Sequence, residues 1–391
     1  MPLPLLESLP FELDQFTLLE RLATGGMADV YLAIDRGAAT PRWVAVKRIR
    51  ADLASHPEFI DFFVTEGRLT LACHHPHLPT AFYLGRQGSA AGRPYLALEY
   101  IGGPTVLALS RAATRRRRPL AVPAVLAIGL AAARALDHLH NLRDLDGRSL
   151  DVIHRDVTPQ NLLVAPGGVV KLIDMGVART TFQAHRTEAG VIKGKYAYIA
   201  PEQLDKRVSI DQRADLFSLG AVMHELFTGQ PLFHGASDLD TTERVKSGPI
   251  PHPSSMRAEI PTAIADVVMS ALARDPDKRW PSAASMVDAL ERAAEGAGLF
   301  PWQGRLAREV TGLVGVPRQP ALVDGGVVWR EGTPPLAATD DLEDQITPVI
   351  EVRNEAGAWE VPGDPQLKYF LSAGAVEKPW QGSDSTKVGK A

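Results

Sequence analysis

The stretch from residue 152 to 176 constrains this 391-residue chain more than any other. It places Asp156 and Asn161 five residues apart in one loop, and Asp174 follows after two short β-type runs separated by a Pro-Gly-Gly turn. That pattern predicts a hairpin, which would return the second carboxylate beside the first. Two carboxylates and an amide in this arrangement can hold magnesium on a polyphosphate while one carboxylate accepts a hydroxyl proton. The stretch therefore predicts a site suited to phosphoryl transfer.

Further motifs lie before and after this stretch. In chain order, the whole set is Val44-Ala45-Val46-Lys47, His154-Arg155-Asp156, Asn161, Asp174-Met175-Gly176 and Ala200-Pro201-Glu202. The ordered set resembles the signature of protein kinases, and most closely that of bacterial serine/threonine kinases of the eukaryotic (Hanks) type. The resemblance covers residues 17–298. It implies an α+β, two-lobed kinase fold with a small β-rich N-lobe, a larger helical C-lobe and a C-terminal extension.

The resemblance and the composition together divide the chain into four parts. We predict an N-terminal extension at 1–15, the N-lobe and hinge at 16–101, the C-lobe at 102–300, and a partly ordered tail containing Pro, Gly and Trp at 301–391. The activity implied is transfer of the γ-phosphate of ATP, with Mg²⁺, to serine or threonine hydroxyls of protein substrates. Asp156 is then the base, and Asn161 and Asp174 are the magnesium ligands.

A loop of small residues, 23–29, joins two strands predicted over 16–22 and 30–34 near the start of the N-lobe. Gly25 and Gly26 would let backbone N–H groups approach the ATP phosphates without side chains in the way. The kinase pattern has further glycines where this chain has Ala23 and Ala28, which are still small. Without the other motifs, a simple turn between two strands would be an equally good interpretation.

Lys47 lies in an apolar strand predicted over 43–49, where an unpaired ammonium would be costly to bury. A helix is predicted over 57–73, and Glu66 on it matches the acid of the kinase helix C. The resemblance therefore implies a Lys47–Glu66 pair, in which Lys47 contacts the α and β phosphates of ATP.

The adenine site is assigned by the resemblance alone. The strand predicted over 95–100 leads into the hinge, where Leu98 would be the gatekeeper and Glu99 and Ile101 would offer backbone groups to adenine. Three further apolar residues are assigned to the nucleotide site: Val30, Ala45 and Leu163.

The activation segment runs from Asp174 to Glu202 and contains three candidate phosphate acceptors. Kinases with an arginine at the position of Arg155 commonly use it to bind an activation-loop phosphate through a charge-assisted pair. Thr187 is favoured over the alternatives Thr180 and Thr181 because it lies well before the substrate-side stretch. All three could instead be ordinary loop threonines.

Thr158 is the main departure from the kinase pattern, which has a catalytic lysine two residues after the catalytic aspartate. Lys195, in the activation segment, occupies a place where serine/threonine kinases usually have threonine. We predict that the two residue types are exchanged, so that Lys195 supplies the charge near Asp156 and Thr158 supplies the hydroxyl. The alternative is that Lys195 is a solvated loop lysine.

A second class of function is a pseudokinase, a nucleotide-binding regulatory scaffold that transfers no phosphate. The alanines in the glycine loop, Met175 in place of the usual Phe, and Thr158 favour this class. The complete set of catalytic and phosphate-binding residues favours the enzyme. The pair Thr158-Pro159 is more similar to serine/threonine kinases than to tyrosine kinases.

Two further residues have structural roles implied by the resemblance. Asp215 would brace the backbone of the catalytic loop, and Arg279 would pair with Glu202. The arginine run 115–118, before a long apolar helix predicted at 122–140, is interpreted as a solvated loop, with a docking patch for an acidic protein as the alternative.

Composition and charge limit the partners and the compartment. The net charge of −4 gives no indication of a nucleic-acid partner. The single cysteine, Cys73, excludes an internal disulfide, fits a reducing compartment and is interpreted as a helix-packing residue. No Lys or Arg precedes Arg21, and the apolar run 121–133 is too short to span a bilayer. We therefore predict a cytoplasmic protein with no membrane span.

The tail, 301–391, contains many Pro and Gly residues, which are typical of a flexible segment. Its tryptophans argue against full solvation, because four of the six in the chain lie here: Trp302, Trp329, Trp359 and Trp380. Residues 348–361 also alternate as a hairpin would. We predict that the tail docks on the kinase domain or on a partner protein.

Overall fold

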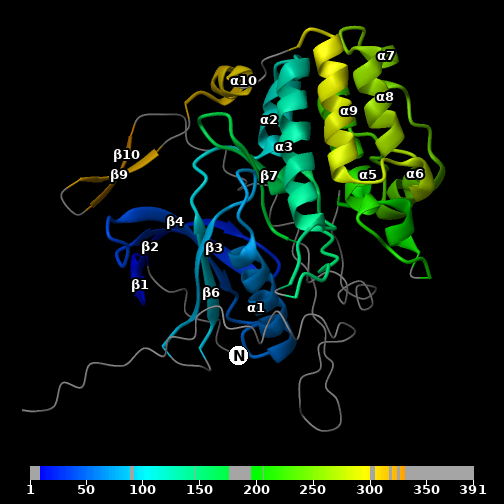
Figure 1. Ribbon diagram of the computed structural model, residues 1–391. Helices are drawn as coiled ribbons and strands as arrows, with labels where there is room; N and C mark the ends of the chain where they lie inside the picture. The colour runs from blue at the N-terminus through cyan, green and yellow to red at the C-terminus, as the bar shows by residue number, and fades with distance from the viewer. Residues whose placement is uncertain are drawn as a thin grey trace, which may run out of the picture.

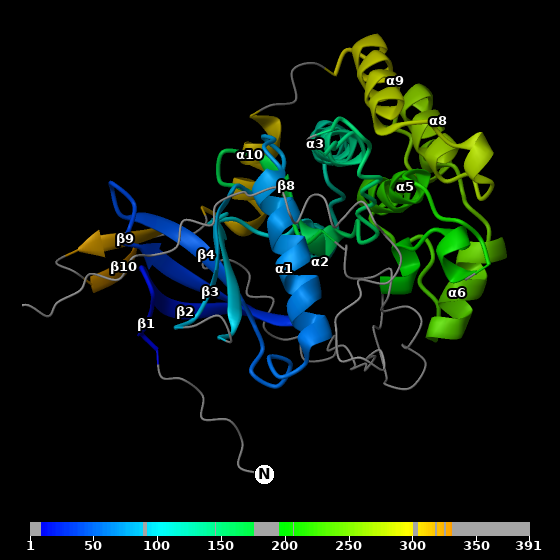
Figure 2. The same ribbon diagram turned by 60° about the horizontal axis from the view of Figure 1, so that its bottom comes forward.

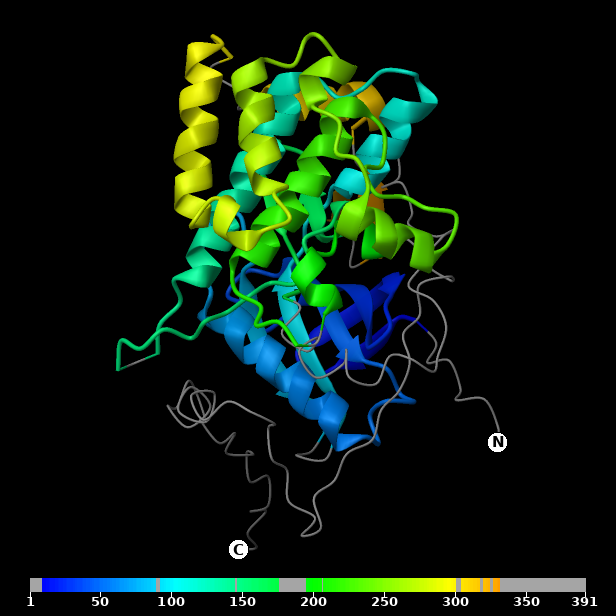
Figure 3. The ribbon, with the colours of Figure 1, turned by 90° about the vertical axis from the view of Figure 1, so that its right-hand side faces the viewer.

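The computed structural model describes residues 9–88, 92–144, 146–175, 195–205, 207–299, 304–316, 319–323 and 326–330. They form a lobe built on a curled sheet and a larger lobe of helices (Figure 1). The helical lobe is stacked on the sheet lobe, and helix α9 (Ala283–Gly296) runs along its outer edge (Figure 3). The α+β, two-lobed architecture expected from the sequence is confirmed.

Six antiparallel strands form the sheet of the N-lobe, in the order β1-β2-β3-β4-β6-β5. Their bounds are β1 (Phe11–Leu13), β2 (Phe16–Thr24), β3 (Ala28–Asp35), β4 (Arg42–Ile49), β5 (Ala81–Arg86) and β6 (Pro94–Glu99). The four strands predicted in this lobe are all present, with ends shifted by one or two residues. β1 pairs with β2, so part of the predicted N-terminal extension contributes a strand to the sheet.

Helix α1 (Pro57–Ala72) packs against β5 and β6, and Figure 2 shows it on the side of the sheet that faces the helical lobe. Proline at its first position has a backbone angle already suited to a helix, which favours a start at this point. Phe59, Phe63 and Leu69 on this helix are buried. Cys73 caps the helix and is buried, as expected for a packing residue.

The helical lobe is built around α3 (Val122–His140), which contacts α5, α9 and β8. The other elements of this lobe are α2 (Val106–Arg115), η1 (Pro159–Asn161), β7 (Leu162–Val164), β8 (Val170–Leu172), η3 (Lys195–Tyr198), η4 (Pro201–Leu204), α5 (Arg213–Thr228), α6 (Asp238–Ser247), α7 (Pro253–Met256), α8 (Thr262–Ala271), η5 (Pro276–Lys278) and α9. Of the described helices, α3 alone is long and apolar enough to cross a bilayer, by length and composition. Most of it is buried inside the lobe, which is where a core helix lies.

The described part of the tail forms α10 (Arg305–Val314) and a hairpin of β9 (Gln319–Val323) and β10 (Gly326–Arg330). α10 packs on α2 and α3, so this part of the tail docks on the helical lobe. The arginines at 115–118 are exposed, as predicted for a solvated run, and two of them also contact α10: Arg118 pairs with Glu309 and Arg116 donates to the Gly312 carbonyl. Trp329 lies in β10. The predicted hairpin at 348–361 and the other three tail tryptophans lie outside the described residues.

Candidate active site

The catalytic loop and Asp174 are brought together by the β7–β8 hairpin. The two strands pair in antiparallel register, with Leu162 opposite Leu172. At the open end of the hairpin, the Ile173 N–H donates to the Asn161 carbonyl at 2.9 Å. The predicted hairpin is therefore confirmed, and it places Asp174 next to the loop that carries Asp156.

Asp215 fixes the backbone of the catalytic loop from below. Its two carboxylate oxygens accept from the His154 N–H at 2.8 Å and from the Arg155 N–H at 2.7 Å. Arg155 has a φ of 61°, a conformation that costs free energy for a non-glycine residue and persists only where neighbours impose it. The predicted bracing role of Asp215 is confirmed, because its two hydrogen bonds hold this strained turn.

His140 completes this buried group and is missing from the sequence analysis. Its Nε2 lies 2.8 Å from Asp215 Oδ2, and both side chains are buried. Burial alone would raise the pKa of Asp215, but the hydrogen bond from His140 and the backbone N–H of Arg155 outweigh it and lower that pKa. The sequence signal for this role was a histidine in the last turn of an apolar helix. Its partner, Asp215, lies 75 residues away in the chain and could not be identified from that signal.

Lys47 binds two carboxylates at once. Its Nζ lies 2.7 Å from Glu66 Oε1 and 2.9 Å from Asp174 Oδ1. Burial alone would lower the pKa of Lys47, but the Asp174 and Glu66 charges raise it above its usual value, so the ammonium stays charged. The Glu66 side chain is 8% exposed, whereas that of Asp174 is 49% exposed and remains open to solvent. The Lys47–Glu66 pair has the geometry that the resemblance implies.

The strand register gathers the predicted nucleotide-site residues on one face of the sheet. Ala23 lies opposite Val30, and Val30 lies opposite Lys47. Ala45 lies opposite Leu98, and it shares a face with Lys47 because side chains two residues apart on a strand point the same way. Val30, Ala45 and Leu98 are all partly exposed. The intervening residues on β4 and β6, such as Val44 and Ala97, are fully buried on the other face.

The glycine loop makes a tight turn between β2 and β3. The Gly25 N–H donates to the Ala28 carbonyl at 2.9 Å, and a Cβ on Gly25 would lie 3.2 Å from the same oxygen. Gly26 follows at the tip of this turn, so the loop carries no long side chain between the two strands until Met27. Small residues at this point leave the backbone open to a phosphate.

The hinge follows β6 and is tied to the helical lobe. The Glu99 N–H donates to the Thr80 carbonyl at 2.8 Å, so this residue can offer adenine only its carbonyl. The Glu99 carboxylate lies 2.7 Å from the ammonium of Lys171, a pair that the sequence analysis did not include. Ile101 is partly exposed, and Leu163 of β7 lies across from Thr105 in an isolated bridge below the hinge.

Asn161 and Asp174 offer a donor set that fits magnesium held together with a nucleotide. The Asn161 side chain donates its Nδ2 to the Asp156 carbonyl at 2.8 Å, which leaves Oδ1 to face a metal. In the described part of the chain, no group of three or more His, Cys, Asp or Glu side chains could hold a metal ion. Magnesium favours one or two protein oxygens and completes its shell with phosphate and water, so the two residues suffice only with a bound polyphosphate.

Thr158 is buried beside the catalytic loop, with 2% exposure, and its hydroxyl has no hydrogen-bond partner among the described residues. Met175 is also buried, so it fills the apolar position that Phe occupies in the kinase pattern. Lys195 begins the 3₁₀ helix η3, but its side chain is outside the described residues. The candidate phosphosites Thr180, Thr181 and Thr187 are outside them as well.

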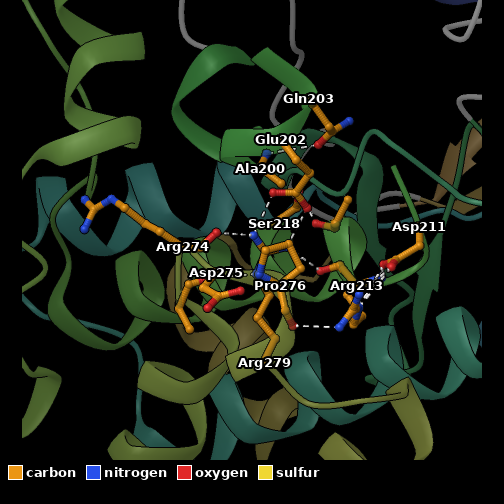
Figure 4. A network of polar contacts seen from close by, with 12 residues as sticks. Ala200, Glu202, Gln203, Asp211, Arg213, Ser218, Arg274, Asp275, Pro276 and Arg279 are labelled. Atoms are coloured by element: carbon orange, nitrogen blue, oxygen red, sulfur yellow. Dashed lines mark hydrogen bonds and ion pairs between the residues drawn. The ribbon is translucent and has the colours of Figure 1, made fainter. Parts of the chain in front are cut away.

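A buried ion pair anchors the end of the activation segment. Both guanidinium Nη atoms of Arg279 bind Glu202, at 2.6 and 2.7 Å, and Arg279 Nε donates to the Ala273 carbonyl (Figure 4). Arg279 also lies over the ring of Phe217. The predicted Glu202–Arg279 pair is confirmed.

Replacing Arg279 with leucine should lower the free energy of unfolding by about 3–5 kcal/mol, because Glu202 would keep a buried charge without its partner. The matched control is Arg207→Leu, which removes an arginine whose side chain is 89% exposed and pairs with Asp205 at the surface. That control should cost about 0–1 kcal/mol. Urea unfolding of both variants measures the difference, and equal losses would contradict the assignment.

Comparisons with known proteins agree with this geometry. A family model, the protein kinase domain, matches residues 16–290. The chain is 34% identical over 291 residues to the tyrosine-protein kinase MasK of Myxococcus xanthus, covering 73% of this chain and 44% of MasK. It is 34% identical over 287 residues to the serine/threonine-protein kinase PknB of Mycolicibacterium smegmatis, covering 72% of this chain and 43% of PknB. The chain thus spans less than half the length of these relatives. The crystal structure of the Mycobacterium tuberculosis PknI kinase domain matches with a TM-score of 0.54 and 27% identity, covering 73% of this chain and 99% of that chain.

Proposed function

Because the chain belongs to the protein kinase family, among the bacterial kinases of the Hanks type, we propose that it is an active serine/threonine kinase. It binds ATP with Mg²⁺ in the cleft between the lobes and transfers the γ-phosphate to hydroxyls of protein substrates. The observation that carries the proposal is the position of Lys47, which contacts Glu66 and Asp174 together.

This observation weighs against the pseudokinase alternative. Bringing Lys47, Glu66 and Asp174 together requires helix α1 to be turned toward the sheet and Asp174 to face the cleft, which is the arrangement that phosphate transfer needs. A regulatory scaffold that binds nucleotide without transferring phosphate would not need the complete set, which also includes the base Asp156. Ala23 and Met175, which favoured the scaffold, both occupy positions compatible with the enzyme.

Each residue then has one role. Asp156 accepts the proton of the substrate hydroxyl, and Lys47 holds the α and β phosphates while Glu66 fixes its direction. Asn161 and Asp174 would hold magnesium, which bridges the phosphate oxygens and neutralises the charge that develops on them when it is bound. Gly25 and Gly26 cover the phosphates with backbone N–H groups.

The adenine end of the site is formed by the sheet face and the hinge. Val30, Ala45 and Leu98 above and Leu163 below would enclose the base, and the Glu99 carbonyl and the Ile101 N–H would bind its edge. The half-buried state of the four apolar side chains supports this role, because each retains surface that a ligand could cover.

Serine and threonine are the proposed acceptors because Thr158-Pro159 is more similar to the Lys-Pro pair of serine/threonine kinases than to the Ala/Arg pattern of tyrosine kinases. The relative named as a tyrosine kinase makes tyrosine the alternative. Incubation with labelled ATP and Mg²⁺, followed by phosphoamino-acid analysis of the protein and of a generic substrate, decides between them. Phosphoserine and phosphothreonine are expected. Phosphotyrosine alone would reassign the acceptor, and absence of transfer despite nucleotide binding would favour the scaffold.

The kinase should phosphorylate itself between Asp174 and Glu202, because Arg155 precedes Asp156 at the position that such kinases commonly use to bind an activation-loop phosphate. Thr187 is the favoured site, with Thr180 and Thr181 as alternatives. Mass spectrometry after incubation with ATP, compared with an Asp156→Asn control, measures it. Finding no phosphate in this segment, with activity unchanged after phosphatase treatment, would mean that the segment is ordered without modification.

The setting of the enzyme is bacterial signalling in the cytoplasm, with proteins rather than nucleic acids or a membrane as partners. The buried free thiol of Cys73 and the use of ATP support a reducing compartment. The burial of α3 supports its interpretation as a core helix rather than a membrane span.

A further inference from the structure

Helix α10 lies after the region matched by the kinase family, yet it is firmly seated on the helical lobe. Leu306, Val310 and Leu313 recur at helical spacing and are all buried. Such an apolar stripe facing a protein surface is the usual sign of a helix docked on a core. Its burial explains why this part of the tail is ordered despite the composition of residues 301–391.

Polar contacts fix where α10 lies along the lobe. Arg118 lies 3.2 Å from the carboxylate of Glu309, and Arg116 donates to the Gly312 carbonyl. On another side, Ala307 packs against Gly168 in the turn of the β7–β8 hairpin, where a Cβ would lie 3.0 Å from the Ala307 N–H nitrogen. α10 is therefore anchored between the α2–α3 connection and the hairpin that carries Asp174.

Beyond α10, the chain reaches the hinge. The Gln319 side chain, at the start of β9, donates its Nε2 to the Gly102 carbonyl at 3.0 Å. A Cβ on Gly102 would lie only 2.7 Å from that same Nε2, so the missing side chain is what lets the amide approach. The β9–β10 hairpin that follows lies beside the outer strands of the N-lobe in both Figure 1 and Figure 2.

The two glycines after Ile101, Gly102 and Gly103, contact different parts of the chain. Gly103 lies against β7, where a Cβ would be 1.8 Å from the Val164 carbonyl oxygen, and its N–H donates to the Ile101 carbonyl at 2.8 Å. Gly102 has the Gln319 amide on its other side. Two consecutive glycines leave the backbone of a hinge with many accessible conformations. The contacts of Gly102 with Gln319 and of Gly103 with Val164 restrict that freedom.

We propose that Gln319 is a positioning residue of the nucleotide site, which holds the hinge at Gly102 in the conformation that presents the Ile101 backbone to adenine. α10 serves as the anchor that brings Gln319 to this point. The inference rests on the proposed function, since it concerns the binding of ATP. The physical basis is preorganisation: a hinge already fixed in the bound conformation loses less conformational entropy when the nucleotide binds.

The test is nucleotide affinity in the full-length protein, measured with a fluorescent N-methylanthraniloyl derivative of ATP in the presence of Mg²⁺. Gln319→Ala removes the donor and should raise the Kd about 3- to 10-fold, the effect of losing one net hydrogen bond. Gln319→Glu keeps the size of the side chain but places an acceptor against the Gly102 carbonyl, so it should weaken binding at least as much. Turnover at saturating ATP should stay unchanged in both, with the loss confined to the KM for ATP.

Gln230→Ala is the matched control, because this glutamine is exposed at the end of α5. Its Kd should equal that of the wild type, and thermal unfolding should give the same Tm for all four proteins. Weaker binding in both Gln319 variants supports the proposal. If both variants bind the nucleotide with wild-type affinity, the proposal is overturned. If Gln319→Glu alone binds with wild-type affinity, the proposal is also overturned, because the side chain would then contribute only packing and no hydrogen bond. A wild-type protein that binds no nucleotide would contradict the proposed function as well, and the two failures are therefore distinguishable.

Discussion

We expect Asp174→Ala to abolish phosphate transfer. Asp174 is the half-exposed carboxylate that contacts Lys47 from the cleft side, and with Asn161 it is a proposed magnesium ligand. Without it, a metal-bridged triphosphate loses its main protein ligand, and the charge that builds up on the transferred phosphate is no longer neutralised. Initial rates with labelled ATP over a range of Mg²⁺ concentrations measure the effect.

Two comparisons make the Asp174 result specific. Lys47→Ala should abolish transfer too, because Lys47 is the cation placed to hold the phosphates. Asp288→Ala removes an exposed carboxylate on α9 and should leave the rate unchanged. Wild-type turnover in Asp174→Ala would show that the magnesium assignment is wrong, whereas a loss in Asp288→Ala would point to general damage.

The second large effect concerns Lys195 and Thr158. The kinase pattern has a lysine at position 158, and it neutralises the γ-phosphate during transfer. Thr158 cannot do this, and its buried hydroxyl lacks a partner among the described residues. A buried hydroxyl without a hydrogen-bond partner costs free energy. We therefore expect a polar side chain of the activation segment to bind the Thr158 hydroxyl when the segment is in its active conformation. We propose that Lys195 is that group, so that Thr158 binds it and Lys195 supplies the missing charge beside Asp156.

Lys195→Thr should therefore lower turnover by roughly 10²–10³-fold, the cost of removing one preorganised charge donor. The double variant Thr158→Lys with Lys195→Thr should recover part of the loss, because it restores the usual kinase arrangement. A double-mutant cycle gives the coupling between the two positions. Lys246→Thr, which changes an exposed lysine on α6, is the control. Unchanged turnover in Lys195→Thr would leave Lys195 as a solvated loop residue and end the hypothesis.

Local sequence patterns predicted those elements whose side chains repeat with a clear period. α3 begins at Val122 and ends at His140, as predicted, because a proline lies in its first turn and apolar residues recur along its length. The β7–β8 hairpin follows from its turn residues, and the strand register then places Ala23, Val30 and Lys47 on one face. Motif order supplied the pairs Lys47–Glu66 and Glu202–Arg279, since periodicity alone cannot pair residues that are far apart in the chain.

The contacts that the sequence did not predict join distant segments without a motif. His140 meets Asp215, Lys171 meets Glu99, and Gln319 meets Gly102. Each depends on how helices and strands pack, and a single His, Lys or Gln carries no signal of its partner. The exposure predicted for the arginine run 115–118 is confirmed, but no local pattern predicted the pairing of Arg118 with Glu309, which lies 191 residues later.

The central claim, that this chain transfers phosphate with Asp156 as the base, is tested most directly by comparing the wild type with Asp156→Asn. Both proteins are measured for Mg-ATP binding and for transfer of labelled phosphate. The account predicts that Asp156→Asn binds nucleotide as the wild type does and that its transfer rate falls by about 10²–10⁴-fold, the contribution of a positioned base. Transfer by the variant at the wild-type rate, or no transfer by either protein despite nucleotide binding, would contradict it.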